Sequence, residues 1–382
     1  MRLVLMLGLA GLLSTAACSS RPWPTKEWLM SDPEAQGLDR DVLAKLDEDL
    51  GSGRHGYVDG MLVIRNGRIV YESSYTNDYD RLFASAPDRS PGPYNYYDPE
   101  WHPYYQRGPL HTMQSVTKSV TSALIGIAIQ RGEIPGAETN ALPYFEGYRL
   151  DDDARRGRMT LRHLLTMSAG IGWDEETVPY TDPANSCAAM EASPDWVQFV
   201  LAQPMAAEPG GGFLYNSGVS QLLSQVLRRA TGLHVDAYAE KYLFGPLGIA
   251  DYHWKRTPTG HPDTEGGLYL APRDLARIGY LYLNRGEWEG RRVLPEGWVE
   301  ASTSPLIPAG PDEPGYAYGY QWWVFRDAVP PAYAARGYGG QDLLVVPELD
   351  LIAVFTGWNI YDRPPLDARL ALDRVVLAVR RR

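Results

Sequence analysis

The sequence has 382 residues, of which 44% are hydrophobic and 22% are charged, a composition that is ordinary for a globular protein and fits one large domain or two. The formal net charge is -11 and the only basic run is residues 380–382, so nothing neutralises a row of phosphates and nucleic-acid binding is not expected. No metal-binding or cofactor-binding motif occurs, and we expect the protein to work without a metal or a cofactor.

The first 18 residues have the features of a signal peptide. Residues 3–13 form an apolar run that is too short to span a bilayer, and small residues then precede Cys18. This arrangement resembles a bacterial lipobox, in which Cys18 is lipidated, although Thr15 stands where leucine is more usual and simple cleavage is the alternative. Ser19 resembles the outer-membrane sorting pattern. We therefore expect an exported outer-membrane lipoprotein on the periplasmic face, whose lipid is its only membrane contact.

A tether and a single domain are expected after the signal peptide. Residues 19–36 are rich in proline and serine and predict a tether, whereas the pattern of a folded domain begins near Leu38. We therefore predict one domain over residues 37–382. Cys187 is the only cysteine besides Cys18, so a lipidated Cys18 leaves no internal disulfide, and we predict that Cys187 is a small buried residue.

The first elements are a helix, a hairpin and a long loop. Residues 38–50 have helical periodicity. The apolar segments 61–65 and 68–72 flank Asn66-Gly67, the strongest short signal for a β-hairpin. Residues 85–109 show no periodicity, so we predict a long ordered loop, and loops of this length are usually functional or mobile. Its aromatic residues include Tyr94, Tyr96, Tyr97, Trp101, Tyr104 and Tyr105.

The middle of the chain predicts helices and the end predicts strands. Helical patterns cover 115–131, 161–165, 217–231 and 272–285, strand patterns cover 320–325, 343–346 and 351–356, and a last helix covers 365–380. Strands near both ends of the chain imply one antiparallel sheet built from both termini and flanked by helices. We therefore predict an α/β (α+β) protein of two subdomains, with an all-helical insertion at about 110–315.

Ser115 and Lys118 form a Ser-x-x-Lys pattern at the start of a predicted helix. A serine hydroxyl is a weak nucleophile until a neighbouring group takes its proton. The spacing puts the Lys118 amine on the same helix face, one turn away. The helix N-terminus also favours developing negative charge. A chain of this length contains about one such pattern by composition alone, so a solvated surface lysine is the alternative.

Five segments together resemble the serine β-lactamase and penicillin-binding superfamily, in its class C branch with family VIII carboxylesterases and nylon-oligomer hydrolases. They are QSVTKS at 114–119, MTLRHLLTMSAG at 159–170, PGGGFLYNS at 209–217, YLFGPLGI at 242–249 and GGLYLAPRDLARIG at 266–279. The resemblance covers roughly residues 60–376. It implies a β-lactamase/transpeptidase-like fold, with Ser115 as the nucleophile and Lys118 as a proton carrier.

The resemblance implies that Tyr215 is the tyrosine of the second motif. A phenol beside a lysine cation is stabilised as phenolate, so Tyr215 and Lys118 can exchange a proton, and which of them deprotonates Ser115 stays open. The motif reads Tyr-Asn-Ser, so Ser217 stands where an amide is more usual. We expect the Ser217 hydroxyl to bond to Lys118 or to the substrate. The alternative for Tyr215 is a buried tyrosine with one hydrogen bond.

The third motif departs from the family pattern, which has lysine or histidine, a small residue and glycine. The best counterpart runs from Ala335 to Gly340 and leads into Gln341. On this alignment Gly337 lets the substrate approach the strand, and the N–H groups of Tyr338 and Ser115 form the oxyanion hole. Ala335 replaces the side chain that helps to hold the carboxylate of a β-lactam, which argues against antibiotic hydrolysis as the main task. An alternative alignment centres the motif on Gly337 and Gly339 and lacks the same side chain.

Several other residues are weaker candidates for the site. His111 precedes Ser115 by four residues and either lines the cleft or anchors a loop. Tyr180 is a candidate hydrogen-bond donor to the substrate. His163 lies in an apolar helix and is expected to be structural. The acidic run 174–176 predicts a solvated turn.

These observations predict a serine hydrolase that cleaves small esters or amides through an acyl-enzyme on Ser115. A β-lactamase or a D,D-peptidase is the first alternative, which Ala335 weakens. A non-catalytic envelope binding protein is the second, and it is disfavoured because Ser115, Lys118 and Tyr215 are all present. The expected partner is a small ester or amide, and the sequence indicates no oligomeric state.

Overall fold

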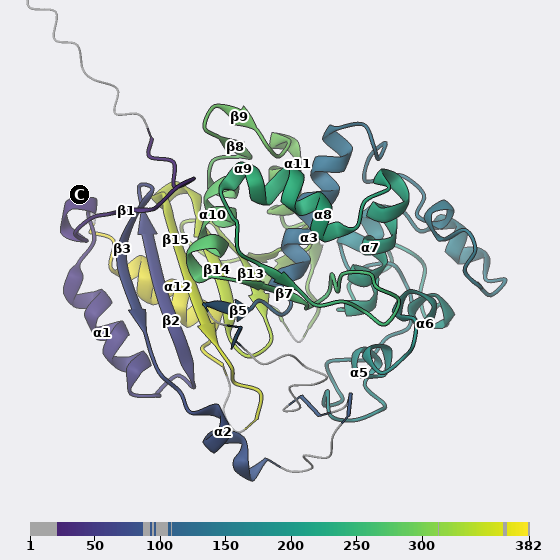
Figure 1. The fold of residues 1–382 in the computed structure, drawn as a ribbon, viewed down its shortest axis with the longest axis horizontal. Helices are drawn as coiled ribbons and strands as arrows, with labels where there is room; N and C mark the ends of the chain where they lie inside the picture. Colours follow the sequence, from purple (N-terminus) through teal and green to yellow (C-terminus); the bar gives the residue numbers. More distant parts are fainter. Residues whose placement is uncertain are drawn as a thin grey trace, which may run out of the picture.

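A nine-stranded sheet forms the centre of one half of the molecule (Figure 1). The structure is a computed structural model that describes residues 21–86, 92–93, 95–96, 106–107, 109–311, 313–361 and 365–380. The strand order is β1-β3-β2-β15-β14-β13-β12-β11-β10. The strands are β1 (Leu29–Met30), β2 (Val58–Arg65), β3 (Arg68–Ser74), β10 (Ile307–Pro308), β11 (Tyr316–Tyr318), β12 (Trp323–Phe325), β13 (Ala332–Gly337), β14 (Gln341–Val346) and β15 (Leu351–Gly357).

The sheet is assembled from both ends of the chain, as the sequence predicts. Asn66 and Gly67 have φ of 50° and 72°, which suits a tight hairpin turn between β2 and β3. The last strand, β15, pairs antiparallel with β2, with Ile352 opposite Ile64. The exception to the antiparallel pattern is β1, which pairs parallel with β3.

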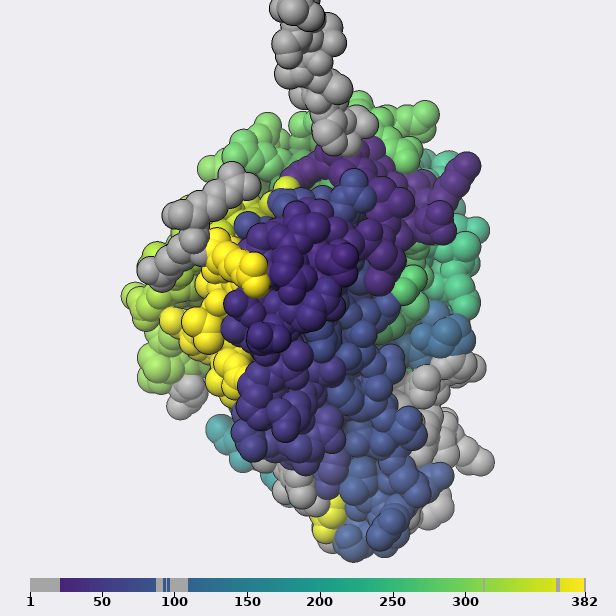
Figure 2. All heavy atoms as spheres, turned by 90° about the vertical axis from the view of Figure 1, so that its left-hand side faces the viewer, coloured from purple at the N-terminus to yellow at the C-terminus, as the bar shows by residue number. Residues whose placement is uncertain are grey.

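Helices cover both faces of the sheet. Helices α1 (Arg40–Gly51) and α12 (Ala368–Leu377) lie on one face, where the N-terminal and C-terminal segments are side by side (Figure 2). Helices α3 (Val116–Gln130) and α10 (Pro272–Leu283) pack on the opposite face (Figure 1). The predicted helices at 38–50, 115–131, 272–285 and 365–380 are therefore confirmed, with ends displaced by a few residues.

The helical subdomain begins at α3 (Figure 1). Its further helices are α4 (Leu161–Leu165), α5 (Ser186–Glu191), α6 (Trp196–Ala202), α7 (Ser217–Thr231), α8 (Val235–Ala239), α9 (Gly245–Leu247) and α11 (Glu296–Ser302), with a π-helical segment at Glu240–Phe244. Helices α5, α6 and α7 lie farthest from the large sheet in Figure 1. The helix α2 (Tyr79–Leu82) and the 3₁₀ turns Glu34–Gln36, Phe83–Ser85, Leu142–Phe145, Ala154–Arg158 and Pro347–Leu349 complete the helical elements of the described residues. None of the described helices has the length and apolar character needed to cross a membrane.

Short strands interrupt the insertion, which was predicted to be all helical. A four-stranded sheet in the order β4-β5-β7-β6 contains β4 (Gln106–Arg107), β5 (Leu110–Thr112), β7 (Leu268–Leu270) and β6 (His253–Trp254). A second small sheet pairs β8 (Glu287–Trp288) with β9 (Arg291–Arg292). Strands of two or three residues are too short to show a period in the sequence, which is why the pattern missed them. The strand β5 matters most, because it leads directly into Ser115.

The prediction of a tether over residues 19–36 is wrong for its described part. The Trp28 side chain is only 5% exposed and its indole N–H donates to the carbonyl of Arg273 at 3.0 Å. The Arg277 guanidinium donates to the carbonyl of Pro24 at 2.8 Å. The segment therefore packs on α10 as part of the domain, because burial of its tryptophans outweighs the local flexibility that its proline and serine content suggested.

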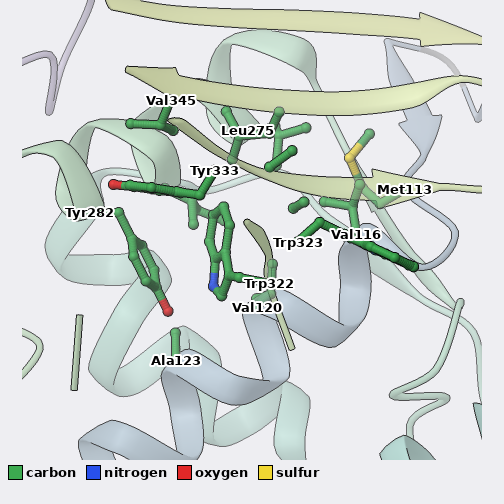
Figure 3. Close-up of a cluster of buried hydrophobic side chains, with 14 of the residues drawn as sticks. Met113, Val116, Val120, Ala123, Leu275, Tyr282, Trp322, Trp323, Tyr333 and Val345 are labelled. Carbon is green, nitrogen blue, oxygen red and sulfur yellow. The ribbon is translucent and has the colours of Figure 1, made fainter. Parts of the chain in front are cut away.

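The core under the sheet fixes the position of α3. Figure 3 shows Val116, Val120 and Ala123 of this helix directed toward the sheet, and all three are fully buried. They face Trp322 and Tyr333, whose rings lie 5.4 Å apart edge to face. Burying aliphatic and aromatic side chains of this size contributes about 1.5–3 kcal/mol each, so the start of α3 is held firmly.

A buried glutamine ties three helices together near the site. Gln321 has a φ of 63° and breaks the predicted strand 320–325 into a turn followed by β12. Its backbone carbonyl accepts from Ser119 of α3 at 2.5 Å, and its side-chain oxygen accepts from Ser220 of α7 at 2.7 Å. Its amide N–H donates to the carbonyls of Leu164 and Leu165 at 3.1 Å. This residue therefore sets α3 and α7, which carry the candidate site, relative to each other.

Candidate active site

Ser115 lies in a tight turn between β5 and α3. Gln114 before it has a φ of 46°, an unusual backbone conformation for a residue with a side chain. The N–H of Val116 donates to the carbonyl of Met113 at 3.1 Å, which closes the turn. Ser115 is half-buried, so its hydroxyl is held at the N-terminus of α3 with access to the surface.

Lys118 is buried beneath Ser115. Its side chain is 1% exposed, and its Nζ donates to Ser115 Oγ at 2.8 Å and to the backbone carbonyl of Glu265 at 2.7 Å. A third contact reaches Glu265 Oε2 at 3.4 Å. The solvated surface lysine that composition alone allowed is thereby ruled out.

Tyr215, just before α7, is the third member of the site with Ser115 and Lys118. The Lys118 Nζ lies 5.3 Å from the centre of the Tyr215 ring, and the phenol is within hydrogen-bond reach of Ser115 and Lys118. Asn216 accepts from the N–H of Val219 and caps α7, which fixes Tyr215 just before the helix. The Tyr215 ring also stacks on Trp323, with centroids 5.8 Å apart.

Burial and charge set the protonation states of the pair. Burial by itself lowers the pKa of Lys118, but the interactions with the acidic side chains around it, Tyr215, Glu265 and Glu175, outweigh burial and raise the pKa. Burial raises the pKa of Tyr215, and the Lys118 cation opposes this only in part. At neutral pH the resting site therefore holds a lysine cation and a neutral phenol.

Ser217 does not bond to Lys118, which was one of the two partners predicted for its hydroxyl. Its hydroxyl donates to Glu175 Oε1 at 2.8 Å, and its backbone N–H donates to Glu175 Oε2 at 2.9 Å. The prediction of a solvated turn at 174–176 is also wrong for Glu175, which is 3% exposed. Burial raises the pKa of Glu175, while the charge of Lys118 lowers it. A carboxylate that was missed from the sequence thus fixes the start of α7 behind Tyr215.

The third motif approaches Ser115 from β13. A Cβ on Gly337 would lie 2.5 Å from the carbonyl oxygen of Met113 and 3.2 Å from Cβ of Gln114, so only glycine allows the strand to pass this close to the serine turn. Tyr338 follows Gly337. In the part of the chain that the structure describes, no acceptor is paired with the backbone N–H of Ser115 or of Tyr338. These two N–H groups are available to an oxyanion.

The other predicted residues of the third motif have contacts within the protein. Ala335 is buried, at 1% exposure. The Arg336 guanidinium lies over the ring of Trp323 at 5.2 Å, with Asp342 at 3.9 Å. Gly339, a predicted substrate contact, is buried in a turn at a φ of 96°, where a Cβ would lie 2.9 Å from the ring of Trp358. Gly339 therefore has a structural role in the turn.

Tyr180 lies in an aromatic cluster with Tyr96 and Tyr338. Its ring centroid lies 5.3 Å from that of Tyr96 and 5.0 Å from that of Tyr338. Tyr180 thus lies beside Tyr338, and its hydroxyl contact to Glu175, at 3.5 Å, is long. Its role as a hydrogen-bond donor to the substrate stays a prediction. The other aromatic residues of the predicted loop, Tyr94, Tyr97, Trp101, Tyr104 and Tyr105, lie outside the described residues, as does Cys18.

The remaining candidates have structural contacts. His111 is buried in β5, with Nε2 3.0 Å from Asp59 Oδ2 and Nδ1 2.8 Å from the carbonyl of Thr112, which fits the anchoring alternative. His163 takes part in the capping box of α4 with Thr160. Cys187 is buried, as predicted, and burial raises the pKa of its thiol.

Glu265 is the second carboxylate that the sequence did not indicate. It stands directly before the Gly266-Gly267 pair of a segment that shows the resemblance, but that segment was used only for the resemblance itself. Its contact with Lys118 joins residues 147 positions apart. Neither Glu175 nor Glu265 lies on a regular element, so no periodicity could have revealed that their side chains turn inward.

Comparisons with known proteins show the family to which the chain belongs. The beta-lactamase family model matches residues 43–373. A 6-aminohexanoate-dimer hydrolase of Paenarthrobacter ureafaciens is 27% identical over 275 residues, which cover 66% of this chain and 68% of that protein. Monacolin J acid methylbutanoyltransferase of Aspergillus terreus is 29% identical over 158 residues, or 37% of each chain.

Solved structures share the fold. The structure of EstCE1, a hydrolase with promiscuous acyltransferase activity, has a TM-score of 0.60 and 16% identity, and the match covers 85% of this chain and 94% of that one. The penicillin-binding protein from Bacillus halodurans also has a TM-score of 0.60, with 87% and 99% covered. These matches confirm the predicted fold, and the family model spans most of the sequence. The chain therefore belongs to the beta-lactamase family and is a serine hydrolase.

Proposed function

We propose that this protein hydrolyses small esters and amides through an acyl-enzyme on Ser115. The observation that carries the proposal is the 2.8 Å hydrogen bond between the Lys118 amine and Ser115 Oγ, with Tyr215 beside both. A nucleophile in hydrogen-bond reach of a base, which other groups hold in place, is the general arrangement for covalent catalysis by serine. Relatives that are named as a dimer hydrolase, an esterase and acyltransferases support acyl chemistry of this kind.

Each of these residues has a role in one step of the proposed reaction. Ser115 Oγ forms a bond to the substrate carbonyl carbon while its proton passes to Lys118, and the N–H groups of Ser115 and Tyr338 hold the oxyanion. The bond to the leaving group then breaks, and the leaving oxygen or nitrogen takes a proton from Lys118 or Tyr215. Water attacks the acyl-enzyme in the second half of the cycle, which releases the acid and restores Ser115.

The third motif favours esters and amides over β-lactams. Ala335 offers no charge or hydrogen bond to a substrate carboxylate, and Arg336 lies over Trp323 and Tyr316 instead of taking its place. Binding of a penicillin would then lack the ionic contact that usually orients its carboxylate.

Mass spectrometry of the intact protein tests this proposal. Incubation with a p-nitrophenyl acyl ester is expected to give a transient acyl adduct on Ser115 with continuous turnover, and incubation with a penicillin is expected to give none. Ser115→Ala is the matched control and should form no adduct with either compound. Full ester turnover by Ser115→Ala would exclude Ser115 as the nucleophile, and a long-lived penicilloyl adduct would favour a penicillin-binding peptidase.

We also propose that the protein is exported and carries a lipid on Cys18, with its domain on the periplasmic side of the outer membrane. The support is the sequence of the first 19 residues. Cells that express the protein and are grown with radiolabelled palmitate are expected to label it, and Cys18→Ala is expected to abolish the label. A labelled Cys18→Ala variant would contradict the lipid anchor.

A further inference from the structure

The proposed acylation step needs Lys118 to be neutral, and the structure shows where its proton can go. The amine is buried, so it exchanges protons through its partners. Its hydrogen-bond partners among the described residues are Ser115 Oγ, Tyr215, the backbone carbonyl of Glu265 and Glu265 Oε2. The serine is the nucleophile, the resting Tyr215 is a neutral phenol that already holds its proton, and a backbone carbonyl does not take up a proton near neutral pH. The Glu265 carboxylate is the remaining acceptor.

Glu265 also connects Lys118 with further buried charged groups, which lie on the side away from Ser115. Its carboxyl lines a small cavity of about 20 Å³, which has room for about one water molecule. Carboxylate oxygens of Glu191, Asp263 and Glu265 lie within 4.8 Å of one another around this space. The Lys255 ammonium lies among them, 3.0 Å from Glu191 and 3.6 Å from Asp263. Polar groups thus continue from Lys118 past Glu265 to a second buried cation.

We propose that Glu265 is the proton acceptor of Lys118, so that it acts on Ser115 through the lysine as a positioning residue. Before the reaction the Lys118 ammonium gives one proton to the Glu265 carboxylate, which leaves a neutral amine. During bond formation that amine takes the proton of Ser115, and it returns this proton to the leaving group when the second bond breaks. The Glu265 proton moves back to Lys118 at the end of the cycle, so protons balance. This inference rests on the proposed function of Ser115.

The charges around Glu265 set the pH above which its side chain is a carboxylate that can accept a proton. Burial raises the pKa of Glu265 to about 8, the charge of Asp263 adds to the rise, and Lys118 opposes it. Glu191 at the end of α5 raises the pKa further, and Lys255 lowers it. The other ionisable groups around this pair are Tyr96, Tyr180, Tyr215, Tyr269, Glu175 and Cys187. Glu265 therefore becomes a carboxylate, able to accept a proton, as the pH rises through about 8.

The experiment measures how fast a fluorophosphonate labels Ser115 between about pH 6 and pH 10. In this reaction a bond forms from Ser115 Oγ to phosphorus, fluoride leaves, and the serine proton goes to Lys118. The wild-type rate constant is expected to rise with pH and to show an inflection near pH 8. Glu265→Gln keeps the size of the side chain but cannot accept a proton. Its labelling at pH 8 is expected to be at least about tenfold slower, with the inflection moved to higher pH.

Three controls separate proton transfer from a structural role. Glu348→Gln removes an exposed carboxylate on the 3₁₀ turn Pro347–Leu349 and is expected to match the wild type. Glu265→Asp keeps a carboxylate and should label faster than Glu265→Gln. Formate should accelerate the labelling of Glu265→Ala, because it supplies a small carboxylate. An unchanged rate and inflection in Glu265→Gln, or no rescue by aspartate and formate, would overturn the inference. Absence of labelling in the wild type would instead refute the proposed role of Ser115.

Discussion

Methionine in place of Lys118 is expected to lower kcat/KM for p-nitrophenyl esters by about 10²- to 10⁴-fold, the range that a positioned proton carrier contributes. Methionine fills most of the same space, but it cannot take the Ser115 proton across the 2.8 Å contact. Steady-state kinetics of the purified variant measure the effect. Lys45→Met removes an exposed lysine of α1 and is the control, for which no change in rate is expected. A loss smaller than about tenfold would contradict a direct role of Lys118.

The same variant is expected to show a defined change in the pH dependence of stability. The pKa of Glu265 is about 8 in the folded chain, above its ordinary value of 4.5, so the folded state binds more protons and stability falls as pH rises through this window. Lys118 limits that loss because its charge lowers the pKa of Glu265. Without Lys118, the free energy of unfolding should be closest to the wild-type value near pH 5 and fall further below it near pH 8. Thermal or urea unfolding at the two pH values measures the difference.

Alanine in place of Gly337 is expected to lower kcat by about 10²-fold, the cost of a displacement of about 1 Å at a reacting centre. The added Cβ would lie 2.5 Å from the backbone oxygen of Met113, and the contacting atom cannot rotate away as a side chain would. Either β13 or the serine turn must move, and the spacing between the backbone N–H groups of Tyr338 and Ser115 then changes. Destabilisation of about 1–3 kcal/mol should accompany the loss, as for other overpacked positions.

Gly297→Ala is the matched control for Gly337→Ala. Gly297 lies in α11 with no atom within 4 Å of an added Cβ, so alanine there should leave activity unchanged and stabilise the helix by about 0.4–1 kcal/mol. Kinetics together with thermal unfolding of both variants separate a local displacement from a general effect of alanine. Wild-type kcat in Gly337→Ala would show that β13 does not place the oxyanion donors.

The sequence predicts the regular elements of the fold well and the irregular ones poorly. Long periodic segments such as the helix at 217–231 match α7 residue for residue, because an apolar stripe and an asparagine cap act locally. The tether prediction failed because Trp28 is buried by α10, which is remote in the sequence. Likewise, the break at Gln321 depends on hydrogen bonds to α3, α4 and α7, and none of these is visible in the strand pattern itself.

The candidate site likewise contains some residues that the sequence indicates and others that only the structure reveals. Ser115 and Lys118 come together because helix geometry fixes residues three positions apart. Tyr215 was placed by its resemblance to a family motif. Glu175 and Glu265 could not be found, since each lies in an irregular segment and reaches its partner only after the chain has folded. Spacing therefore indicated the pair of Ser115 and Lys118, and the resemblance indicated the roles proposed for them, whereas the two buried acids beside them required the structure.

The two ends of the large sheet have a consequence for association between molecules. A free strand edge presents unpaired backbone groups to which a strand of another molecule can add. Within the described residues, the outermost strands are β1 and β10, each of two residues, and β10 includes Pro308, which has no backbone N–H to donate. Such edges give an incoming strand little to pair with. The long hydrophobic strands β2, β14 and β15 all lie inside the sheet, so folding itself protects this protein from edge-to-edge aggregation.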